Sequence, residues 1–180
     1  LVPTPSLEDG SYDVSAVWEV VEDFKQEMKL ANYPKNFIVG CTTNPGDCEL
    51  FQKELPQSVS VYYNPEFIAQ GSIVRDLRKA DMVLLGYSPS NSEYEKTISE
   101  IEELYKKIQT TRAIVCVMSN TSAEITKIAL NCFLTTKISY ANMLGDVLRN
   151  AGCGDEIPTV LSAIGTDSRV GRKYLRYGFG

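Results

Sequence analysis

Glu66 has the setting in this chain that most strongly suggests chemistry. Residues 59–63 are β-branched and aromatic, which is typical of a strand. Pro65 keeps the residue before it out of the helical region, so the strand must end before the carboxylate. In an open α/β sheet, ligands bind beyond the carboxyl ends of the strands, and Glu66 would face such a crevice if the sheet is parallel. The simpler interpretation is an acid in the first turn of a helix, stabilised by the helix dipole.

Lys127 and Asn131 stand four residues apart in a helical pattern and therefore project from one face. Together, an ammonium group and a carboxamide can polarise an oxygen atom. The alternative is an ordinary helix-surface pair, in which the lysine bonds to a neighbouring amide. The apolar residues 128–130 between them and the poor helix propensity of asparagine favour a site.

Thr42 lies in a polar loop, residues 40–47, directly after a predicted strand. Its hydroxyl could orient a water molecule or contact a cofactor. An ordinary strand-to-helix loop with Asp47 as the helix N-cap explains the same residues equally well. Near the start of the chain, residues 2–5 (Val-Pro-Thr-Pro) and the acidic turn 8–10 predict a stiff loop.

Strand-like runs alternate with helical patterns along the first two thirds of the chain. The predicted strands cover residues 37–40, 59–63, 82–86 and 113–118. This order predicts an α/β fold with a parallel or mostly parallel sheet and helices packed on it. Two amphipathic helices are expected between and before the strands, one capped by Asp13 and one by Asn91 or Ser92.

A single helical pattern then runs from about residue 122 to residue 151, closed by Gly152. Roughly 30 residues at ~1.5 Å each give a rod of more than about 40 Å. Its apolar side chains lie on most sides, so we expect it to pack against another subunit or a further domain. Shorter helices are predicted over residues 155–164 and 170–174.

The composition narrows the class of protein. With 180 residues, 43% of them hydrophobic, the chain can form one domain, or one domain and part of a second. A net charge of -5 argues against a nucleic-acid surface. Five cysteines without C-x-x-C spacing and no histidine argue against a metal site and favour reduced thiols in the cytoplasm. The sequence shows neither a signal peptide nor a long apolar run, so we expect no membrane partner.

Taken in order, these elements resemble the UDP-glucose/GDP-mannose dehydrogenase family over essentially the whole chain. The matching segments are V-P-T-P at 2–5 with D-G-S at 9–11, Thr42 in its loop, N-P-E-F at 64–67, the A-E-x-x-K-x-x-x-N-x-F helix at 123–133, and G-T-D-S-R-V-G at 165–171. Five motifs in this order are hard to obtain by chance.

The resemblance implies two domains. Residues 1–119 would be the C-terminal half of an NAD-binding, Rossmann-like domain with a partial parallel sheet and flanking helices. Residues 120–180 would begin an all-α central domain, whose long helix at about 122–151 forms a homodimer.

The resemblance also implies an activity, the NAD-dependent, two-step oxidation of the C6 alcohol of a nucleotide sugar to a carboxylate. UDP-glucose is the favoured substrate and UDP-glucuronate the product. In that scheme a cysteine forms a thiohemiacetal with the aldehyde, and a glutamate drives hydrolysis of the later thioester. Glu66 matches that glutamate, Lys127 and Asn131 the groups that stabilise the oxyanion, and Thr42 the residue near the nicotinamide and the water.

Binding roles follow from the same resemblance. The implied cofactor-binding residues are Val2, Thr4, Pro5, Thr42 and Gln70. The implied substrate-binding residues are Phe67, Ile68, Lys127, Asn131, Arg169 and Arg176. Arg169 would reach into the site of the neighbouring subunit, and Arg176 would bind toward the nucleotide end of the substrate.

The chain departs from the family pattern in two ways. The family's G-x-G-x-x-G fingerprint should precede Leu1, and its nucleophilic cysteine should follow Gly180. We therefore expect a central fragment of a longer parent chain, inactive alone, in which all five cysteines are structural. Gln70 stands where many relatives hold a second glutamate, and an amide cannot act as a base.

Two other functions compete with this one. A β-hydroxyacid or 6-phosphogluconate type dehydrogenase also places a lysine and an asparagine four apart on a long helix, but the N-P-E-F turn at 64–67 disfavours it. A catalytically inert dimerisation module is the alternative from a different class.

Overall fold

The computed structural model describes residues 1–28, 34–68 and 71–178. Contacts within the chain divide it into two compact units, Leu1–Lys127 and Ile128–Gly180. Helix α5, Asn120–Asn150, belongs to both, because the boundary falls within it. The two units are described separately below.

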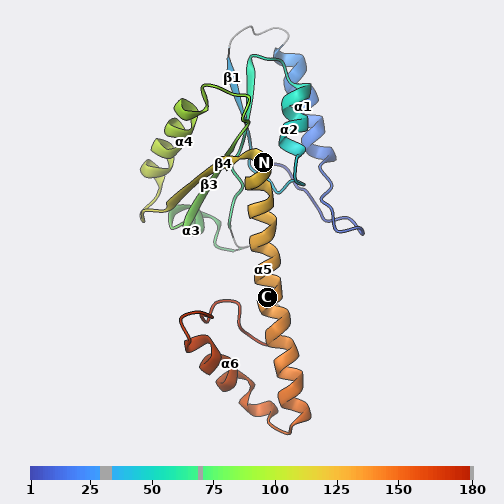
Figure 1. The fold of residues 1–180 in the computed structure, drawn as a ribbon, viewed down its shortest axis with the longest axis vertical. Helices are drawn as coiled ribbons and strands as arrows, with labels where there is room; N and C mark the ends of the chain where they lie inside the picture. Colours follow the sequence, from blue (N-terminus) through green and yellow to red (C-terminus); the bar gives the residue numbers. More distant parts are fainter. Residues whose placement is uncertain (29–33, 69–70, 179–180) are drawn as a thin grey trace. The chain divides into compact units, whose positions relative to one another are not determined.

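The first unit is built around a four-stranded sheet with the order β1-β2-β3-β4 (Figure 1). The strands are β1 Lys35–Val39, β2 Val59–Tyr63, β3 Met82–Tyr87 and β4 Ile114–Ser119. β1 pairs with β2 in parallel, and so does β3 with β4. β2 and β3 run antiparallel and share only a short register. The α/β prediction is confirmed, with one antiparallel pairing in a mostly parallel sheet.

Helices cover both faces of the sheet (Figure 1). α1, Ser15–Met28, and α2, Asp47–Glu54, lie on one face, where they share a core with the inner residues of β2. α4, Tyr94–Ile108, packs on the other face with residues of β3. The alternation is clear in β2, where Val61 and Tyr63 belong to the first core and Tyr62 to the second, as the period of two requires. A short helix, α3 Ile73–Arg78, lies between β2 and β3.

Asp13 and Asn91, two of the predicted caps, each bond to the backbone just ahead of a helix, but the N-cap predicted for α4 is wrong, because Glu93 occupies that position. The carboxylate of Asp13 accepts a hydrogen bond from the backbone N–H of Ser15 at 2.9 Å, at the start of α1. The side chain of Asn91 accepts one from the N–H of Glu93 at 3.0 Å, immediately before α4. These bonds satisfy backbone donors that have no partner inside a helix.

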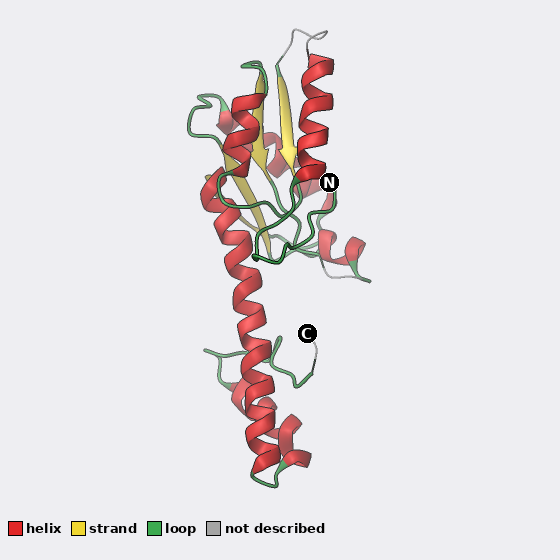
Figure 2. Ribbon diagram, turned by 90° about the vertical axis from the view of Figure 1, so that its right-hand side faces the viewer, coloured by secondary structure: helices red, strands yellow, loops and turns green. Residues whose placement is uncertain are grey.

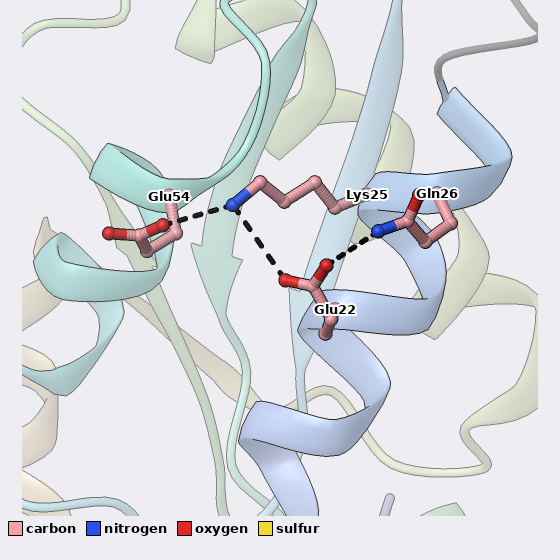
Figure 3. A network of polar contacts seen from close by, with 4 residues as sticks. All are labelled: Glu22, Lys25, Gln26 and Glu54. Atoms are coloured by element: carbon pink, nitrogen blue, oxygen red, sulfur yellow. Dashed lines mark hydrogen bonds and ion pairs between the residues drawn. The ribbon is translucent and has the colours of Figure 1, made fainter.

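The outer surfaces of α1 and α2 are joined by an exposed polar network (Figure 3). The ammonium group of Lys25 lies 3.1 Å from the carboxylate of Glu54 and 3.7 Å from that of Glu22. Gln26 donates a further hydrogen bond to Glu22 at 2.7 Å. Exposed pairs of this kind add little stability, because water screens both charges.

β4 continues into α5 without a loop, since Ser119 ends the strand and Asn120 begins the helix. Asn120 is fully buried, and its side-chain amide donates to the carbonyl of Val61 in β2 at 3.2 Å. A side chain on Gly86 in β3 would collide with Asn120, because its Cβ would lie 2.8 Å from the Asn120 Oδ1. The start of α5 is therefore locked onto the sheet.

The second unit consists of most of α5 and the segment that follows it. The predicted long helix is confirmed, and it ends as expected at Gly152, whose φ is +78°. The N–H groups of Gly152 and Cys153 bond back to Arg149 and Leu148, the pattern of a Schellman motif. A short 3-10 turn, Gly154–Glu156, leads into α6, Ile157–Thr166.

The predicted helix over residues 170–174 is wrong, and Figure 2 shows a loop after α6. The carbonyl of Asp167 accepts hydrogen bonds from the N–H groups of Val170 and Gly171, which closes a turn instead. Gly171 and Tyr174 both have positive φ, at +71° and +62°, a conformation that interrupts a right-handed helix.

The loop after α6 ends against α5 at a site that we call the tyrosine dock, formed by Asn142, Gly145, Tyr177 and Gly178. The ring of Tyr177 covers Gly145, where an added Cβ would lie 2.0 Å from a ring carbon. The Asn142 side chain both accepts from the N–H of Gly178 at 2.7 Å and donates to its carbonyl at 3.1 Å. Only a glycine on α5 leaves room for this approach.

Candidate functional site

The loops that carry Thr42 and Glu66 leave the same edge of the sheet. β1 and β2 are parallel, and their last residues, Val39 and Tyr63, are paired. The N–H of Asn64 then bonds to the carbonyl of Val39 at 2.8 Å. Glu66 therefore follows the carboxyl end of a parallel strand, as predicted. The alternative of a helix-start acid is wrong, because residues 64–68 form no helix.

A cleft of about 420 Å³ opens between these loops and the start of the chain. It is lined by Leu1, Val2, Pro3, Thr4, Cys41, Thr42, Glu66 and Ile68. Five of the predicted site residues therefore share one cavity wall. Pro5 and Phe67 are absent from its lining, and Gln70 lies outside the described residues.

Lys127 reaches the second of these loops from α5. Its ammonium group donates a hydrogen bond to the backbone carbonyl of Glu66 at 2.6 Å and lies 4.5 Å from the ring centre of Phe67. The side chain is only 7% exposed, so the alternative of a helix-surface lysine is wrong. Burial lowers the pKa of Lys127, and the nearby charge of Glu66 opposes that shift. Lys127 is therefore a buried cation bonded to the backbone of a loop that lines the cleft, although Lys127 itself does not line it.

Glu124 holds the loop that carries Thr42, a contact that was not predicted from the sequence. Its carboxylate accepts hydrogen bonds from the N–H of Gly46 at 2.6 Å and the N–H of Cys48 at 2.9 Å, and from the hydroxyl of Thr43 at 3.0 Å. Glu124 therefore caps α2 from a distant part of the chain. The predicted N-cap, Asp47, is wrong: Gly46 occupies the N-cap position with a φ of +98° and has no side chain to offer.

Glu124 is fully buried within a small polar cluster. Burial raises the pKa of its carboxyl, and the hydrogen bonds from Cys48, Gly46 and Thr43 oppose the rise. Burial also raises the pKa of the Cys48 thiol well above its usual value, with the Glu124 charge adding to the effect. The hydroxyl of Tyr63 lies in the same cluster, and burial raises its pKa as well. The spacing in the sequence could have pointed to Glu124, because it precedes Lys127 by three residues and so shares its helix face.

The loop is fixed from its other side by Asn44. Its side chain accepts a hydrogen bond from the N–H of Tyr12 at 2.7 Å and donates one to the carbonyl of Tyr12 at 2.9 Å. The carboxylate of Asp47 accepts from both the backbone and the side chain of Asn44. The N–H of Asp13 bonds to the carbonyl of Pro5 at 2.8 Å, so the opening loop is tied to the same region.

The remaining predicted residues belong to the second unit. Asn131 follows Lys127 by one turn of α5, is half-buried, and accepts a hydrogen bond from Thr135 at its backbone carbonyl. Arg169 is 87% exposed and forms a bidentate pair with Asp167, at 2.7 and 3.0 Å. Arg176 is exposed. The first unit thus brings together Thr42, Glu66 and Lys127. Asn131, Arg169 and Arg176 belong to the second unit.

In the part of the chain that the structure describes, no group of three or more histidine, cysteine, aspartate or glutamate side chains is arranged to hold a metal ion. No helix there is long and apolar enough to cross a membrane.

Comparison with known proteins identifies both parts of the chain. Residues 1–109 match the UDP-glucose/GDP-mannose dehydrogenase family, NAD binding domain, and residues 121–180 match the central domain of the same family. The UDP-glucose 6-dehydrogenase YwqF of Bacillus subtilis is 34% identical over 182 residues, and that of Pseudomonas aeruginosa is 31% identical over 189 residues. Each alignment covers 99% of this chain and 39% of the relative.

Solved structures give the same result. A UDP-glucose dehydrogenase from Pyrobaculum islandicum superimposes with a TM-score of 0.85 at 31% identity, over 98% of this chain and 40% of that one. The GDP-mannose dehydrogenase of Pseudomonas aeruginosa shares the fold, with a TM-score of 0.77 at 22% identity. The chain spans about two fifths of the length of these dehydrogenases. From its first strand to its last helix, the chain belongs to the UDP-glucose/GDP-mannose dehydrogenase family.

Proposed function

We propose that these residues form the core of an NAD-dependent dehydrogenase that oxidises the C6 alcohol of UDP-glucose to the carboxylate of UDP-glucuronate. The observation that carries the proposal is the convergence of Thr42, Glu66 and Lys127 at the carboxyl ends of β1 and β2. UDP-glucose is the favoured substrate because relatives of that name are 31% and 34% identical to this chain. Since the chain spans 39% of their length, the activity is proposed for a longer protein, and the 180 residues alone should be inactive.

The cleft fits one end of a dinucleotide. Val2 and Pro3 give it an apolar wall, and Thr4 and Thr42 contribute hydroxyls, a combination suited to a flat ring that carries a carboxamide. Val2, Thr4, Pro5, Thr42 and Gln70 are the residues proposed to hold NAD. When bound, NAD supplies the acceptor for the two hydrides that leave the sugar.

The charges of the site suit the second half of the reaction. We assign Lys127, with Asn131, to stabilisation of the oxyanion, because a buried ammonium group acts strongly in a site from which water is excluded. In the scheme that the family implies, a cysteine outside these residues carries the substrate as a thiohemiacetal and then as a thioester. Glu66 would take a proton from the water that attacks this thioester, releasing the carboxylate product and the free thiol.

The other assignments concern binding and assembly. Phe67, Ile68, Arg169 and Arg176 are proposed to contact the nucleotide sugar, with Arg169 acting in the neighbouring subunit. The proposed domains are residues 1–119 and 120–180. A homodimer through α5 would cover large side chains that are exposed on that helix, among them Phe133 at 62%, Val147 at 54% and Met143 at 53%. Five unpaired thiols suit a cytoplasmic location.

The test is a substrate screen with the complete protein expressed from its full reading frame. NADH formation is followed with UDP-glucose, GDP-mannose and UDP-N-acetyl sugars. We expect two NADH per UDP-glucose and none from the 180 residues alone. Glu66→Gln should stall the reaction with a covalent adduct visible by mass spectrometry. A complete protein that oxidises none of these sugars would overturn the proposal, and unchanged turnover by Glu66→Gln would remove Glu66 from it.

A further inference from the structure

The first two turns of α5 contact both loops of the cleft. Glu124 and Lys127 are three residues apart and therefore project from the same helix face. Glu124 binds the loop after β1, and Lys127 binds the loop after β2. We call this pair and the two loops that it holds, residues 40–47 and 64–67, the charged clamp.

Glu124 accepts hydrogen bonds from two backbone N–H groups at the α2 N-terminus, those of Gly46 and Cys48, while Asn44 and Asp47 bond to each other in the same loop. Gly46, at the N-cap position, makes no side-chain hydrogen bond. The carboxylate of Glu124 has the negative charge that a helix N-terminus favours, and it uses both oxygens, one for Gly46 and one for Thr43 and Cys48. A buried carboxylate without these donors would be costly, so the loop and the glutamate hold each other.

Thr42 lies between two immobilised neighbours. Thr43 is fully buried and bonded to Glu124, and Cys41 is buried against the cleft wall. Thr42 itself is half-buried and lines the same cleft as Glu66. Its position therefore depends on the anchor that Glu124 provides, although Glu124 does not line the cleft.

We propose that Glu124 is a positioning residue, which sets the location of Thr42 relative to Glu66 by holding residues 43–48 onto the helix that also carries Lys127. The inference rests on the proposed function, because Thr42 and Glu66 are the residues that it positions. It assigns no contact with substrate to Glu124.

The decisive variant is Glu124→Gln in the complete protein. A glutamine oxygen can still accept from Thr43 and Cys48, but its NH2 group then faces the N–H of Gly46, so the loop must shift. We expect kcat per folded enzyme to fall about 10- to 100-fold, because misplacement of a site by about 1 Å has effects of this size. The KM for the nucleotide sugar should stay within roughly twofold, because the loop held by Lys127 is unchanged.

Two further variants separate positioning from folding. Thr43→Val removes a single bond to Glu124 at nearly constant volume, and it should lower kcat in the same direction but less. Glu49→Gln is the matched control, since it makes the same charge change on α2, where Glu49 accepts a hydrogen bond from Ser88 instead. It should leave kcat unchanged. A Glu124→Gln enzyme with less folded protein but normal kcat per folded molecule would overturn the proposal.

A second measurement does not depend on activity. In the complete protein, amide hydrogen exchange at Gly46, whose N–H loses its acceptor, should accelerate at least tenfold in Glu124→Gln and not in Glu49→Gln. Unchanged exchange would overturn the anchoring role even if the wild-type protein oxidised nucleotide sugars. If the wild-type protein oxidised none but the exchange accelerated, the proposed function would fail and the anchor would stand.

Discussion

The charged clamp and the tyrosine dock both fasten loops to α5, and they do so with opposite chemistry. The charged clamp uses two buried ionisable groups, Glu124 and Lys127, whose partners are mostly backbone donors and acceptors. The tyrosine dock uses a neutral amide, an aromatic ring and a glycine, and its exposed charged contacts are those of Arg149 and Asp146 with Tyr177. Each lies in its own unit.

The difference concerns what each contact can do besides hold a loop. Burying a charge costs free energy that a hydrogen bond only partly returns, so an ionic anchor is a poor choice for stability alone. The tyrosine dock depends mainly on volume and close packing against a glycine, with its charged contacts at the exposed hydroxyl of Tyr177. The charged clamp thus holds the loops that carry Thr42 and Glu66, and the tyrosine dock holds the loop that carries Arg169 and Arg176.

The largest effect is expected from Lys127→Met in the complete protein. Loss of an oxyanion donor should lower kcat about 100- to 1,000-fold. The free energy of unfolding should change by no more than about 2 kcal/mol, because the lost hydrogen bond is offset by removal of a buried ammonium. Steady-state NADH assays and urea titration measure the two effects.

The control is Lys137→Met, since Lys137 also donates to a backbone carbonyl, that of Val170, at 2.9 Å. It should keep wild-type kcat. If both lysine variants lost activity equally, the distinction between the two regions would fail.

Gly145→Ala should produce the largest loss of stability. The added Cβ would lie 2.0 Å from the Tyr177 ring, which must leave its place on α5. We expect a loss of about 1–3 kcal/mol in the free energy of unfolding, the usual cost of overpacking. In a Tyr177→Ala background the same substitution should cost almost nothing. Equal costs in the two backgrounds would show that the ring does not occupy this notch.

The next effect in size is expected in the pH dependence of stability, to which Glu124 of the charged clamp should contribute. The pKa of Glu124 is raised above its usual 4.5 in the folded state, so folding favours the protonated form. Its contribution is therefore fully present below pH 4.5 and is lost as the pH rises through the folded-state pKa. A single proton can change the free energy by at most about 1.4 kcal/mol per pH unit.

Glu124→Gln should remove this downward slope. The measurement is the free energy of unfolding from pH 4.5 upward in wild type and variant. A variant that keeps the slope would assign it to another group.

The smallest effect is expected at the exposed network between α1 and α2. Glu54→Gln breaks the 3.1 Å pair with Lys25 (Figure 3). The loss of stability should be small and should vanish in 1 M salt, because surface pairs are screened. A loss that does not depend on salt would mean that exposed charges matter here as much as buried ones.

Local patterns predicted much of this fold, and the exceptions have a common cause. Residues 59–63 were predicted as a strand with the bounds that β2 has, because β-branched residues and Pro65 determine both its type and its end. The direction of β3 could not be predicted, since a strand that is buried on both faces has the same apolar sequence pattern whether it is parallel or antiparallel to its neighbour. The segment after Asp167 was mistaken for a helix because its positive φ values, at Gly171 and Tyr174, are not determined by the apolar pattern of the sequence.

The candidate site divides in the same way. Thr42, Glu66 and Lys127 were identified from the sequence because each is part of a motif with its own local spacing. Glu124 was missed because its partners lie 76 to 81 residues away along the chain, and no local rule connects a helix to a distant uncapped one. The roles of these residues in catalysis stay predictions.

The direct passage from Ser119 in β4 to Asn120 in α5 leaves no slack between sheet and helix. An α-helix turns by about 100° per residue, so one residue inserted at this junction would rotate Glu124 and Lys127 together away from their loops. The length of the junction thus determines how α5 is rotated about its axis, and therefore whether Glu124 and Lys127 face their loops. At this junction, a homologue could tolerate a substitution more easily than the insertion or deletion of a single residue.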